Sequence, residues 1–462
     1  MILNTQTPMK PMTLQEAANS CGGRLICSTH KENSIIKNIS IDSRKIKGGF
    51  LYIPIKGERF DGHDFITSAF ENGAICTLTE NQLDNSDKPQ IVVKSTFQAL
   101  KDIAEYYRSL FSVPIIGISG SSGKTSTKEL IYSVLSEHFN VLKTEGNLNN
   151  EIGVPQTIFQ LRDEHEAAVI EMGISHFGEM TNIAKMVRPD IAVITNIGCA
   201  HLEFLGSRDG ILKAKTEMFK FLSKDGIAIL NGDDDKLRTV NYVDACFFGF
   251  DTKNDCYASD IKPCDLDGTE FKIVHNKYSV NAFIPALGKH MILNALAAYA
   301  IARKLSMPED KIISGIRNFK NIDGRFNIIK TDHITIINDC YNANPESVKA
   351  SLEVMGTLSG RKAAILADMG ELGDTSSQMH TDVGIFAAQK VDVLICIGKQ
   401  SQFIMDGAKK TNSSIICYHF DTNNQAIEKL NSILNKHDTV LVKGSHAMKL
   451  EEITESLKKI EL

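Results

Sequence analysis

The sequence predicts an α/β protein of three domains. A chain of 462 residues exceeds the roughly 250–300 residues at which one hydrophobic core stops growing, so several domains are expected. Short, uninterrupted apolar runs alternate with helical stretches through most of the chain, and such runs are typical of parallel strands buried on both faces. Changes in this rhythm place the domains at about residues 1–100, 101–322 and 323–462.

The first segment is predicted to be a small α/β domain. Its β-rich runs are short, as over residues 50–55, and helical pieces and turn signals such as Asp61-Gly62 separate them. Residues 1–10 contain no apolar core of a signal peptide, so we expect a cytoplasmic protein.

The central segment is predicted to hold a mostly parallel sheet. Its strands are expected at 115–118, 167–170, 191–194 and 227–230. Shorter strand-like runs over 244–286 break the strand–helix rhythm and indicate an antiparallel edge. Helices are expected after it, at 289–305 and 308–318.

The last segment is predicted to be a Rossmann-like, doubly wound domain. After Gly324-Arg325 the alternation of apolar runs and helices resumes. Strand–helix–strand order favours a parallel sheet with helices on both faces. The five expected strands lie at 334–337, 363–366, 393–396, 415–417 and 440–442.

Composition excludes several classes of function. The net charge is −5 and no basic block interleaves with aromatic residues, so no nucleic-acid partner is expected. No apolar run approaches the ~18 residues that span a bilayer, so no stable membrane insertion is expected. The 10 cysteines form no C-x-x-C pair. Of the two interpretations, a metal or disulfide frame and reduced, mostly buried cytosolic thiols, we favour the second.

A glycine-rich loop after the first central strand predicts a phosphate site. The loop and the start of the helix that continues to about residue 137 read Ser119-Gly120-Ser121-Ser122-Gly123-Lys124-Thr125. Glycines let backbone N–H groups face a phosphate, the helix N-terminus adds positive potential, and the lysine reaches the outer phosphates. The Thr125 hydroxyl can ligate Mg²⁺.

The loop departs from the common pattern G-x-x-x-x-G-K-[ST]. Position 118 is Ile, so the motif is the shorter G-x-x-G-K-T. A helix-capping glycine loop that binds nothing is the alternative interpretation. The order of strand, glycines, lysine, hydroxyl and helix favours binding of the phosphates of ATP with Mg²⁺.

Polar side chains also follow the neighbouring central strands. Glu171 ends the run at 167–170, where a carboxylate can coordinate Mg²⁺ or remain solvated. Asn196 and His201 follow the next strand, and a lone histidine is more often structural than a ligand. These positions therefore need support from the rest of the sequence.

Several further motifs give that support. They are Asp42-Ser43-Arg44, residues 56–63 (KGERFDGH), residues 143–155 around Asn147, residues 201–217, Tyr341-Asn342-Ala343-Asn344-Pro345, residues 368–373 with His380, and Lys443-Gly444-Ser445. Together with the phosphate loop they resemble the Mur ligases of bacterial cell-wall synthesis over essentially the whole chain. The run at 341–345 is most similar to the member that adds D-alanyl-D-alanine to UDP-N-acetylmuramoyl-tripeptide.

The resemblance implies an ATP-dependent ligase that joins a carboxylate to an amine through an acyl phosphate. It makes Lys124, His201, Lys215 and Arg325 catalytic, with Lys215, fourteen residues after His201, as a carbamylated lysine. A helix-surface lysine is the alternative at that position. The implied Mg²⁺ ligands are Thr125, Glu171, His201 and Lys215.

The resemblance also assigns binding residues. ATP would be held by Gly120, Ser121, Ser122, Gly123, Lys124, Thr125, Asn294, Arg325, Asp339, Tyr341 and Asn342. The UDP end of the substrate would be held by Ser43, Arg44 and Gly57, and the muramoyl-peptide by Asn147. The implied partners are UDP-N-acetylmuramoyl-tripeptide and D-alanyl-D-alanine, and we expect a monomer. Whether the third stem residue is lysine or diaminopimelate stays open.

One departure from the family concerns the acceptor end. Where the family usually has arginine after Lys443-Gly444-Ser445, this chain has His446, whose charge depends on pH.

Two other classes of function compete with this interpretation. A nucleotide-gated switch shares the phosphate loop but gives no reason for the run at 341–345. A sister ligase such as a folylpolyglutamate synthetase takes glutamate as its acceptor and lacks an amino-terminal uridine-binding domain.

Overall fold

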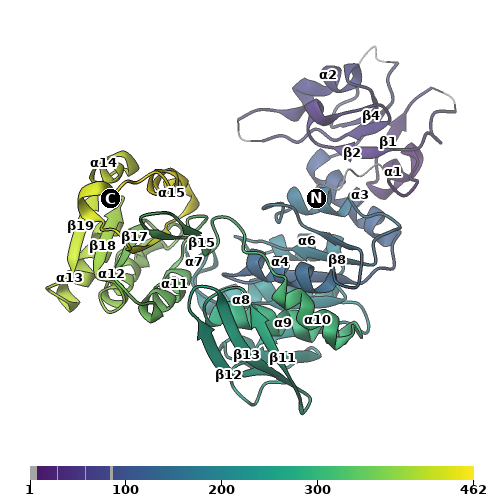
Figure 1. The fold of residues 1–462 in the computed structure, drawn as a ribbon. Coiled ribbons are helices and arrows are strands. Elements are labelled where there is room, and N and C mark those ends of the chain that lie inside the picture. Colours follow the sequence, from purple (N-terminus) through teal and green to yellow (C-terminus); the bar gives the residue numbers. More distant parts are fainter. Residues whose placement is uncertain (1–7, 29, 58, 84–86) are drawn as a thin grey trace. The chain divides into compact units, whose positions relative to one another are not determined.

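The computed structural model describes residues 8–28, 30–57, 59–83 and 87–462, and these residues contain three β-sheets with helices packed against them (Figure 1). The chain divides into two compact units. One takes the chain up to Ile118 with Phe139–Ala192 and Thr216–Ile227; the other takes Ser119–His138, Val193–Lys215 and Ala228–Leu462. Within the described ranges, no helix is both long and apolar enough to cross a membrane.

A five-stranded sheet of order β1-β5-β4-β3-β2 forms the amino-terminal part. Its elements are β1 (Arg24–Ile26), β2 (Asn38–Ser40), β3 (Phe50–Tyr52), β4 (Ala74–Thr79), β5 (Gln90–Val92), α1 (Leu14–Ser20), α2 (Ile66–Glu71) and α3 (Thr96–Ser109). Only β1 runs antiparallel to its neighbour. Leu51, Leu78 and Ile91 are fully buried, which confirms a small α/β domain with its own core.

A nine-stranded sheet of order β14-β13-β12-β11-β10-β9-β6-β8-β7 forms the central part. Its strands are β6 (Ile115–Ser119), β7 (Val141–Lys143), β8 (Ala167–Glu171), β9 (Ile191–Ile194), β10 (Ile227–Asn231), β11 (Ala245–Gly249), β12 (Cys256–Cys264), β13 (Gly268–His275) and β14 (Tyr278–Ile284). The four expected strands are confirmed as β6, β8, β9 and β10. The expected antiparallel edge is confirmed as β12–β14, whereas β11 is parallel to both of its neighbours.

The helices of this part include the two that were predicted. They are α4 (Lys124–Leu135), α5 (Gly153–Ile158), α6 (Glu179–Val187), α7 (Leu202–Leu205), α8 (Arg208–Thr216), α9 (Lys289–Lys304) and α10 (Glu309–Arg317). Helix α9 is buried nearly all round because alanines fill its middle, and α4 packs against it. The helix that follows the phosphate loop is therefore fixed by the core.

A six-stranded sheet of order β15-β16-β20-β17-β18-β19 forms the carboxy-terminal part. Its elements are β15 (Asn327–Lys330), β16 (Thr335–Asn338), β17 (Lys362–Ala367), β18 (Val393–Ile397), β19 (Ile416–Phe420), β20 (Thr439–Lys443), α11 (Pro345–Thr357), α12 (Ser376–Ala387), α13 (Ser401–Thr411), α14 (Asn423–Ile433) and α15 (Glu451–Leu457). The five predicted strands are all parallel to one another. The sequence interpretation missed β15, an antiparallel edge strand paired with β16.

Two separate cores confirm that this sheet is doubly wound. Along β17, Ala364 and Leu366 face a core shared with α11, α12 and α13, whereas Ala363 and Ile365 face a second core shared with α14 and α15. Adjacent strand residues point to opposite faces, so both faces must be apolar. The three-domain α/β class predicted from sequence is thus confirmed.

All ten cysteines are free thiols, which excludes a disulfide frame. Only Cys76, Cys256, Cys340 and Cys396 are buried, fewer than expected, and the other six are partly exposed.

Candidate functional site

The glycine-rich loop lies between β6 and α4, as the sequence predicts, and two of its glycines are required by its shape. Gly120 has a φ of +149°, and a Cβ there would lie 1.9 Å from the Thr195 hydroxyl oxygen. Gly123 has a φ of +78° and caps the N-terminus of α4. Both conformations disfavour residues with a side chain.

The loop is fastened to the segment that follows β9. The Ser121 N–H donates to the carbonyl oxygen of Asn196 at 3.1 Å. The Ser122 N–H donates to Asn196 Oδ1 at 3.0 Å, and Asn196 Nδ2 donates to Ser122 Oγ at 3.0 Å. Ser121 and Ser122 therefore serve as the frame of the loop in this structure. The remaining phosphate donors are the amides of the first turn of α4, which have no carbonyl partner within the helix.

Lys124 and Thr125 open α4 at the mouth of this loop. The Lys124 ammonium donates to the carbonyl oxygen of Gly120 at 2.8 Å, so the lysine folds back over the loop. The Thr125 hydroxyl accepts from Arg325 Nη2 at 3.2 Å. Arg325 also stacks on the ring of Tyr341 at 4.0 Å. The structure thus brings together Lys124, Thr125, Arg325 and Tyr341, four residues that the sequence analysis assigned to ATP.

Lys215 is a fully buried lysine near the C-terminal end of α8. Its Nζ atom is inaccessible and has no hydrogen-bond partner among the described residues. Burial lowers the pKa of its amine well below the ordinary value of 10.5, and the positive charge of Lys124 lowers it further. The alternative of a helix-surface lysine is therefore wrong. A buried neutral amine is the reactive form of lysine toward carbon dioxide.

Glu171 lies at the carboxyl end of β8. It pairs in register with Ile118 of the neighbouring β6, two residues before the phosphate loop begins. The side chain is 1% exposed, and its Oε1 accepts from Asn149 Nδ2 at 2.8 Å. The Thr144 hydroxyl accepts from its N–H at 3.0 Å. Glu171 is a buried carboxylate held by polar groups, and the solvated alternative is wrong.

His201 is held by a carboxylate. It has a φ of +61°, and its Nδ1 lies 2.6 Å from Glu371 Oε2, on a residue whose φ is also +61°. Two non-glycine residues in the left-handed region facing each other mark a constrained contact. The contact turns the Nδ1 edge of the ring toward Glu371, which leaves Nε2 on the opposite edge.

Asn294 is a buried residue of α9. Its Oδ1 accepts from the Thr127 hydroxyl at 2.9 Å and lies 3.9 Å from the position of a Cβ on Gly123. Asn294 therefore braces the first turn of α4 from the core side.

Asp339 fixes the loop at 341–345 through buried hydrogen bonds. Its carboxylate accepts from the Phe326 N–H at 3.2 Å, from the Ser351 hydroxyl at 2.6 Å and from the Lys443 ammonium at 2.6 Å. Lys443 in turn donates to the carbonyl oxygen of Asn342 at 3.1 Å. The buried pair of Asp339 and Lys443 thereby fixes the backbone that carries Tyr341 and Asn342.

The predicted acceptor end near His446 is open. The His446 ring lies 5.4 Å from the Tyr341 ring, and its side chain is 70% exposed. The motif with His380 has a local structural role: His380 Nε2 accepts from the Met369 N–H at 3.0 Å, and burial lowers the pKa of His380.

The residues predicted for the UDP end lie in connections of the amino-terminal part, outside the strands of its sheet. Ser43 is buried in a short helix capped by Asp42, and Arg44 is exposed and paired with Asp42. Gly57 donates its N–H to the carbonyl oxygen of Phe60 at 3.0 Å. Glu58, part of the same motif, lies outside the described residues. Asn147 is exposed in the loop after β7.

Unmodified side chains do not form a ready metal centre: within the described residues, no three His, Cys, Asp or Glu side chains cluster to hold an ion. The predicted donors instead include a hydroxyl and an amine. Oxygen ligands suit Mg²⁺, and three of the four predicted donors would offer oxygen once the Lys215 amine carries a carboxylate, whereas His201 would offer a ring nitrogen.

The framing residues Thr195, Asn196 and Asp234 were not among the predicted site residues. Asn196 was noted only as a polar residue after a strand. The Thr195 hydroxyl donates to the carbonyl oxygen of Ser122 at 2.6 Å, and Asp234 accepts from the Ile197 N–H at 2.8 Å. Their only signal in the sequence is their position at the ends of β9 and β10.

Three models of Mur ligase domains match the chain. The model of the Mur ligase middle domain matches residues 118–302, that of the glutamate ligase domain of Mur ligases matches 324–446, and that of the Mur ligase family catalytic domain matches 35–108.

Relatives and solved structures agree with these matches. The UDP-N-acetylmuramoyl-tripeptide–D-alanyl-D-alanine ligase of Bacillus subtilis is 37% identical over 96% of this chain and 98% of its own length. A crystal structure of MurF from Acinetobacter baumannii, 33% identical, superposes with a TM-score of 0.90 over 98% of this chain and all of its own. A MurF ligase from Thermotoga maritima in complex with ADP, 30% identical, gives 0.84 over 91% of this chain and 97% of its own. These matches span the phosphate loop, the buried lysine and the loop at 341–345, and the chain belongs to the Mur ligase family.

Proposed function

We propose that this chain uses ATP to add D-alanyl-D-alanine to UDP-N-acetylmuramoyl-tripeptide in peptidoglycan precursor synthesis. The observation that carries the proposal is the phosphate loop with Lys124 folded over it, together with a fully buried Lys215 whose pKa is lowered by burial and by the charge of Lys124. The full-length similarity to D-alanyl-D-alanine ligases supports this choice of substrates.

The loop and α4 hold the phosphates of ATP. Lys124 moves from the Gly120 carbonyl oxygen to the γ-phosphate, a short displacement because the side chain already arches over the loop. The first-turn amides and the helix dipole add positive potential. Asn294, Asp339, Tyr341 and Asn342 form the surface for base and ribose, with Asp339 acting through the backbone that it anchors.

Lys215 carries a carbamate in the working enzyme. The burial that keeps its amine neutral favours attack on carbon dioxide, and the charge of Lys124 that opposes an ammonium would stabilise the anionic product. With this carboxylate, Thr125, Glu171 and His201 complete the proposed Mg²⁺ ligands. Mg²⁺, when bound, neutralises the charge that develops on the phosphates.

The reaction begins when the terminal carboxylate of the tripeptide attacks the γ-phosphorus, releasing ADP and forming an acyl phosphate. The amine of D-alanyl-D-alanine then attacks the acyl carbon, loses a proton and expels phosphate, leaving the new peptide bond. Lys124 and Arg325 stabilise the transferring phosphoryl group and hold it in line, and positioning and charge supply most of the rate.

Each of three segments of the chain binds a different substrate. Residues 1–100 bind the uridine nucleotide through Ser43, Arg44 and Gly57, residues 101–322 bind ATP, with Asn147 toward the muramoyl-peptide, and residues 323–462 bind the amino acceptor near His446. We propose a cytoplasmic monomer, since the substrates are soluble nucleotides and dipeptides.

Phosphate release assayed with each substrate omitted in turn tests the proposal. Release should need ATP, UDP-N-acetylmuramoyl-tripeptide and D-alanyl-D-alanine together. Release that needs neither acceptor nor UDP-substrate would instead show a nucleotide switch, and release with glutamate as acceptor would show a sister ligase. Running the assay with lysine- and diaminopimelate-containing stems identifies the third residue.

A further inference from the structure

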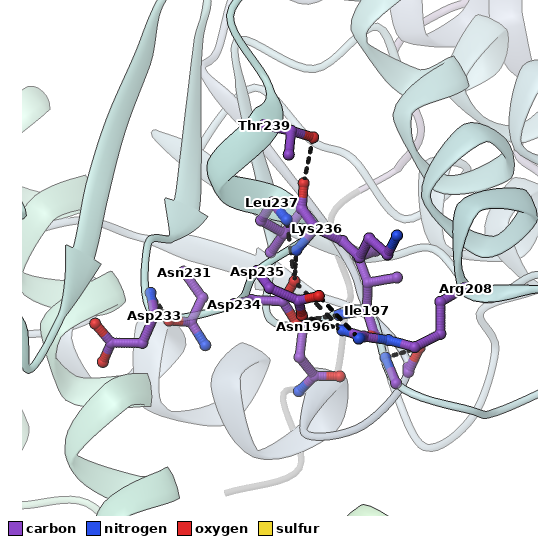
Figure 2. A network of polar contacts seen from close by, with 12 residues as sticks. Asn196, Ile197, Arg208, Asn231, Asp233, Asp234, Asp235, Lys236, Leu237 and Thr239 are labelled. Carbon is purple, nitrogen blue, oxygen red and sulfur yellow. Dashed lines mark hydrogen bonds and ion pairs between the residues drawn. The ribbon is translucent and has the colours of Figure 1, made fainter.

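Outside the residues assigned to substrates, a polar network holds the main chain behind the phosphate loop (Figure 2). Asp234 lies in the turn after β10, and its Oδ2 accepts from the Ile197 N–H at 2.8 Å. Arg208, the first residue of α8, donates through Nε to the carbonyl oxygen of Ile197 at 2.8 Å. The N–H group and the carbonyl oxygen of Ile197 are therefore both held by charged side chains.

The two clamping side chains are themselves held in place. Asp234 Oδ1 accepts from the N–H groups of Lys236 and Leu237 at 2.9 and 3.0 Å. Arg208 pairs with Asp235 through Nη1 at 3.0 Å. The Asp234 side chain is 8% exposed, and charge-assisted hydrogen bonds at a site so shielded from water are strong and directional.

The side chains of Asp234 and Arg208, here called the clamp, hold the segment that frames the phosphate loop. Asn196, one residue before Ile197, bonds Ser122 through its side chain, and the Gly198 N–H, one residue after, donates to Ser121 Oγ at 3.0 Å. Arg208 also begins the helix that carries Lys215 two turns later. The clamp thus ties the back of the phosphate loop to the helix of the buried lysine.

We propose that Asp234 and Arg208 are positioning residues for nucleotide binding: they fix Ile197 and so hold the phosphate loop in its binding shape. Among the described residues, neither side chain forms a hydrogen bond or ion pair with the loop itself, so each acts through the main chain of residues 196–198. This inference rests on the proposed function for its nucleotide but not for its acceptor.

The neighbouring Asp233 provides a matched control. Its carboxylate accepts from the N–H groups of Phe250 and Asp251 at 2.6 and 3.2 Å and from Asn254 at 2.9 Å. It is a structural anchor of the same turn, but its bonds lead to the β11–β12 connection and not to Ile197. Replacing Asp233 therefore costs stability without moving the phosphate loop.

The test is binding of ADP with Mg²⁺ by calorimetry to full-length Asp234→Ala, Arg208→Ala and Asp233→Ala variants, with the thermal midpoint of each measured in parallel. Loss of a hydrogen bond to a charged group predicts that Kd for ADP rises about tenfold or more in Asp234→Ala. It should rise in the same direction in Arg208→Ala and be partly restored in Arg208→Lys, which can still donate to Ile197. Asp233→Ala should lower the thermal midpoint and leave Kd within about twofold.

Several outcomes would overturn the inference. One is an unchanged Kd in Asp234→Ala or, should that variant not fold, in Arg208→Ala. Another is a rise in Asp233→Ala equal to that in Asp234→Ala. A wild-type chain that binds no nucleotide would overturn both this inference and the proposed function. Nucleotide binding that depends on Asp234, without acceptor-dependent phosphate release, would overturn the proposed function alone.

Discussion

Replacing Lys215 by methionine should stabilise the protein and abolish its activity. Met fills about the same volume as the lysine stem and has no amine to desolvate. In the wild type the amine is fully buried and has no hydrogen-bond partner among the described residues, so folding strips it of water and lowers its pKa. Burying an unsatisfied polar group costs about 1–3 kcal/mol, and Lys215→Met should raise the free energy of unfolding by about that amount at neutral pH.

The gain should depend on pH with a definite sign. The folded-state pKa of Lys215 lies below the unfolded value of 10.5, so between the two the unfolded chain binds the extra proton. The proton-linked part of the wild-type penalty is therefore largest at low pH and vanishes above the unfolded pKa, changing by up to about 1.4 kcal/mol for each pH unit, whereas the cost of burying the neutral amine remains. The advantage of Lys215→Met should shrink steadily as the pH rises toward 10.5.

Urea unfolding in buffer free of carbon dioxide and Mg²⁺, from neutral to alkaline pH, measures the effect. Adding bicarbonate and Mg²⁺ should then stabilise the wild type and leave Lys215→Met unchanged, because only the wild type can form the carbamate. A Lys215→Met variant that is less stable than the wild type in the first buffer, or that turns over at the wild-type rate, would refute the reasoning.

Three further predictions concern the phosphate loop, the buried ion pair of Asp339 and Lys443, and a buried histidine. Lys124→Ala should lose at least about a hundredfold in kcat with little change in thermal midpoint, because its ammonium donates to a carbonyl of the binding loop rather than packing in the core; activity within tenfold would show that the loop is misassigned. Asp339→Asn leaves the buried Lys443 ammonium without its counter-charge and should destabilise the protein by about 3–5 kcal/mol, and the double variant with Lys443→Met should regain much of that; equal destabilisation of both variants in chemical unfolding would argue against the ion pair. His380, whose folded pKa burial lowers below 6.5, accepts the Met369 N–H only when neutral, so stability should fall as the pH drops below 6.5, and His380→Gln should flatten that dependence in unfolding measured across acid pH; an identical pH profile would place the acid sensitivity elsewhere.

Local patterns in the sequence predicted the buried parallel strands of the fold. Uninterrupted apolar runs identified the parallel strands, since the two cores of the carboxy-terminal sheet take apolar residues from every position of β18 and from residues 363–367 of β17. Strand β15 was missed because an edge strand with two apolar residues has no such pattern.

The candidate site likewise contains residues that sequence spacing predicts and contacts that it does not predict. The glycines and Lys124 follow from the shape of a loop between a strand and a helix, so sequence spacing predicts them. The clamp on Ile197 joins Arg208 and Asp234 to a residue 37 positions before the latter, and that contact exists only after β9 and β10 align. The burial of Lys215 likewise depends on packing, so the sequence alone did not exclude a position on the helix surface.

Transfer of oxygen from substrate to phosphate tests the central claim most directly. UDP-N-acetylmuramoyl-tripeptide labelled with ¹⁸O in its terminal carboxylate is incubated with the enzyme, ATP and Mg²⁺, with and without D-alanyl-D-alanine, and the released phosphate is analysed by mass spectrometry. We predict one ¹⁸O atom in each phosphate released in the presence of D-alanyl-D-alanine, because the carboxylate oxygen that attacks the γ-phosphorus leaves with it. Phosphate that carries no label while the dipeptide is being joined would contradict activation of the carboxylate by ATP.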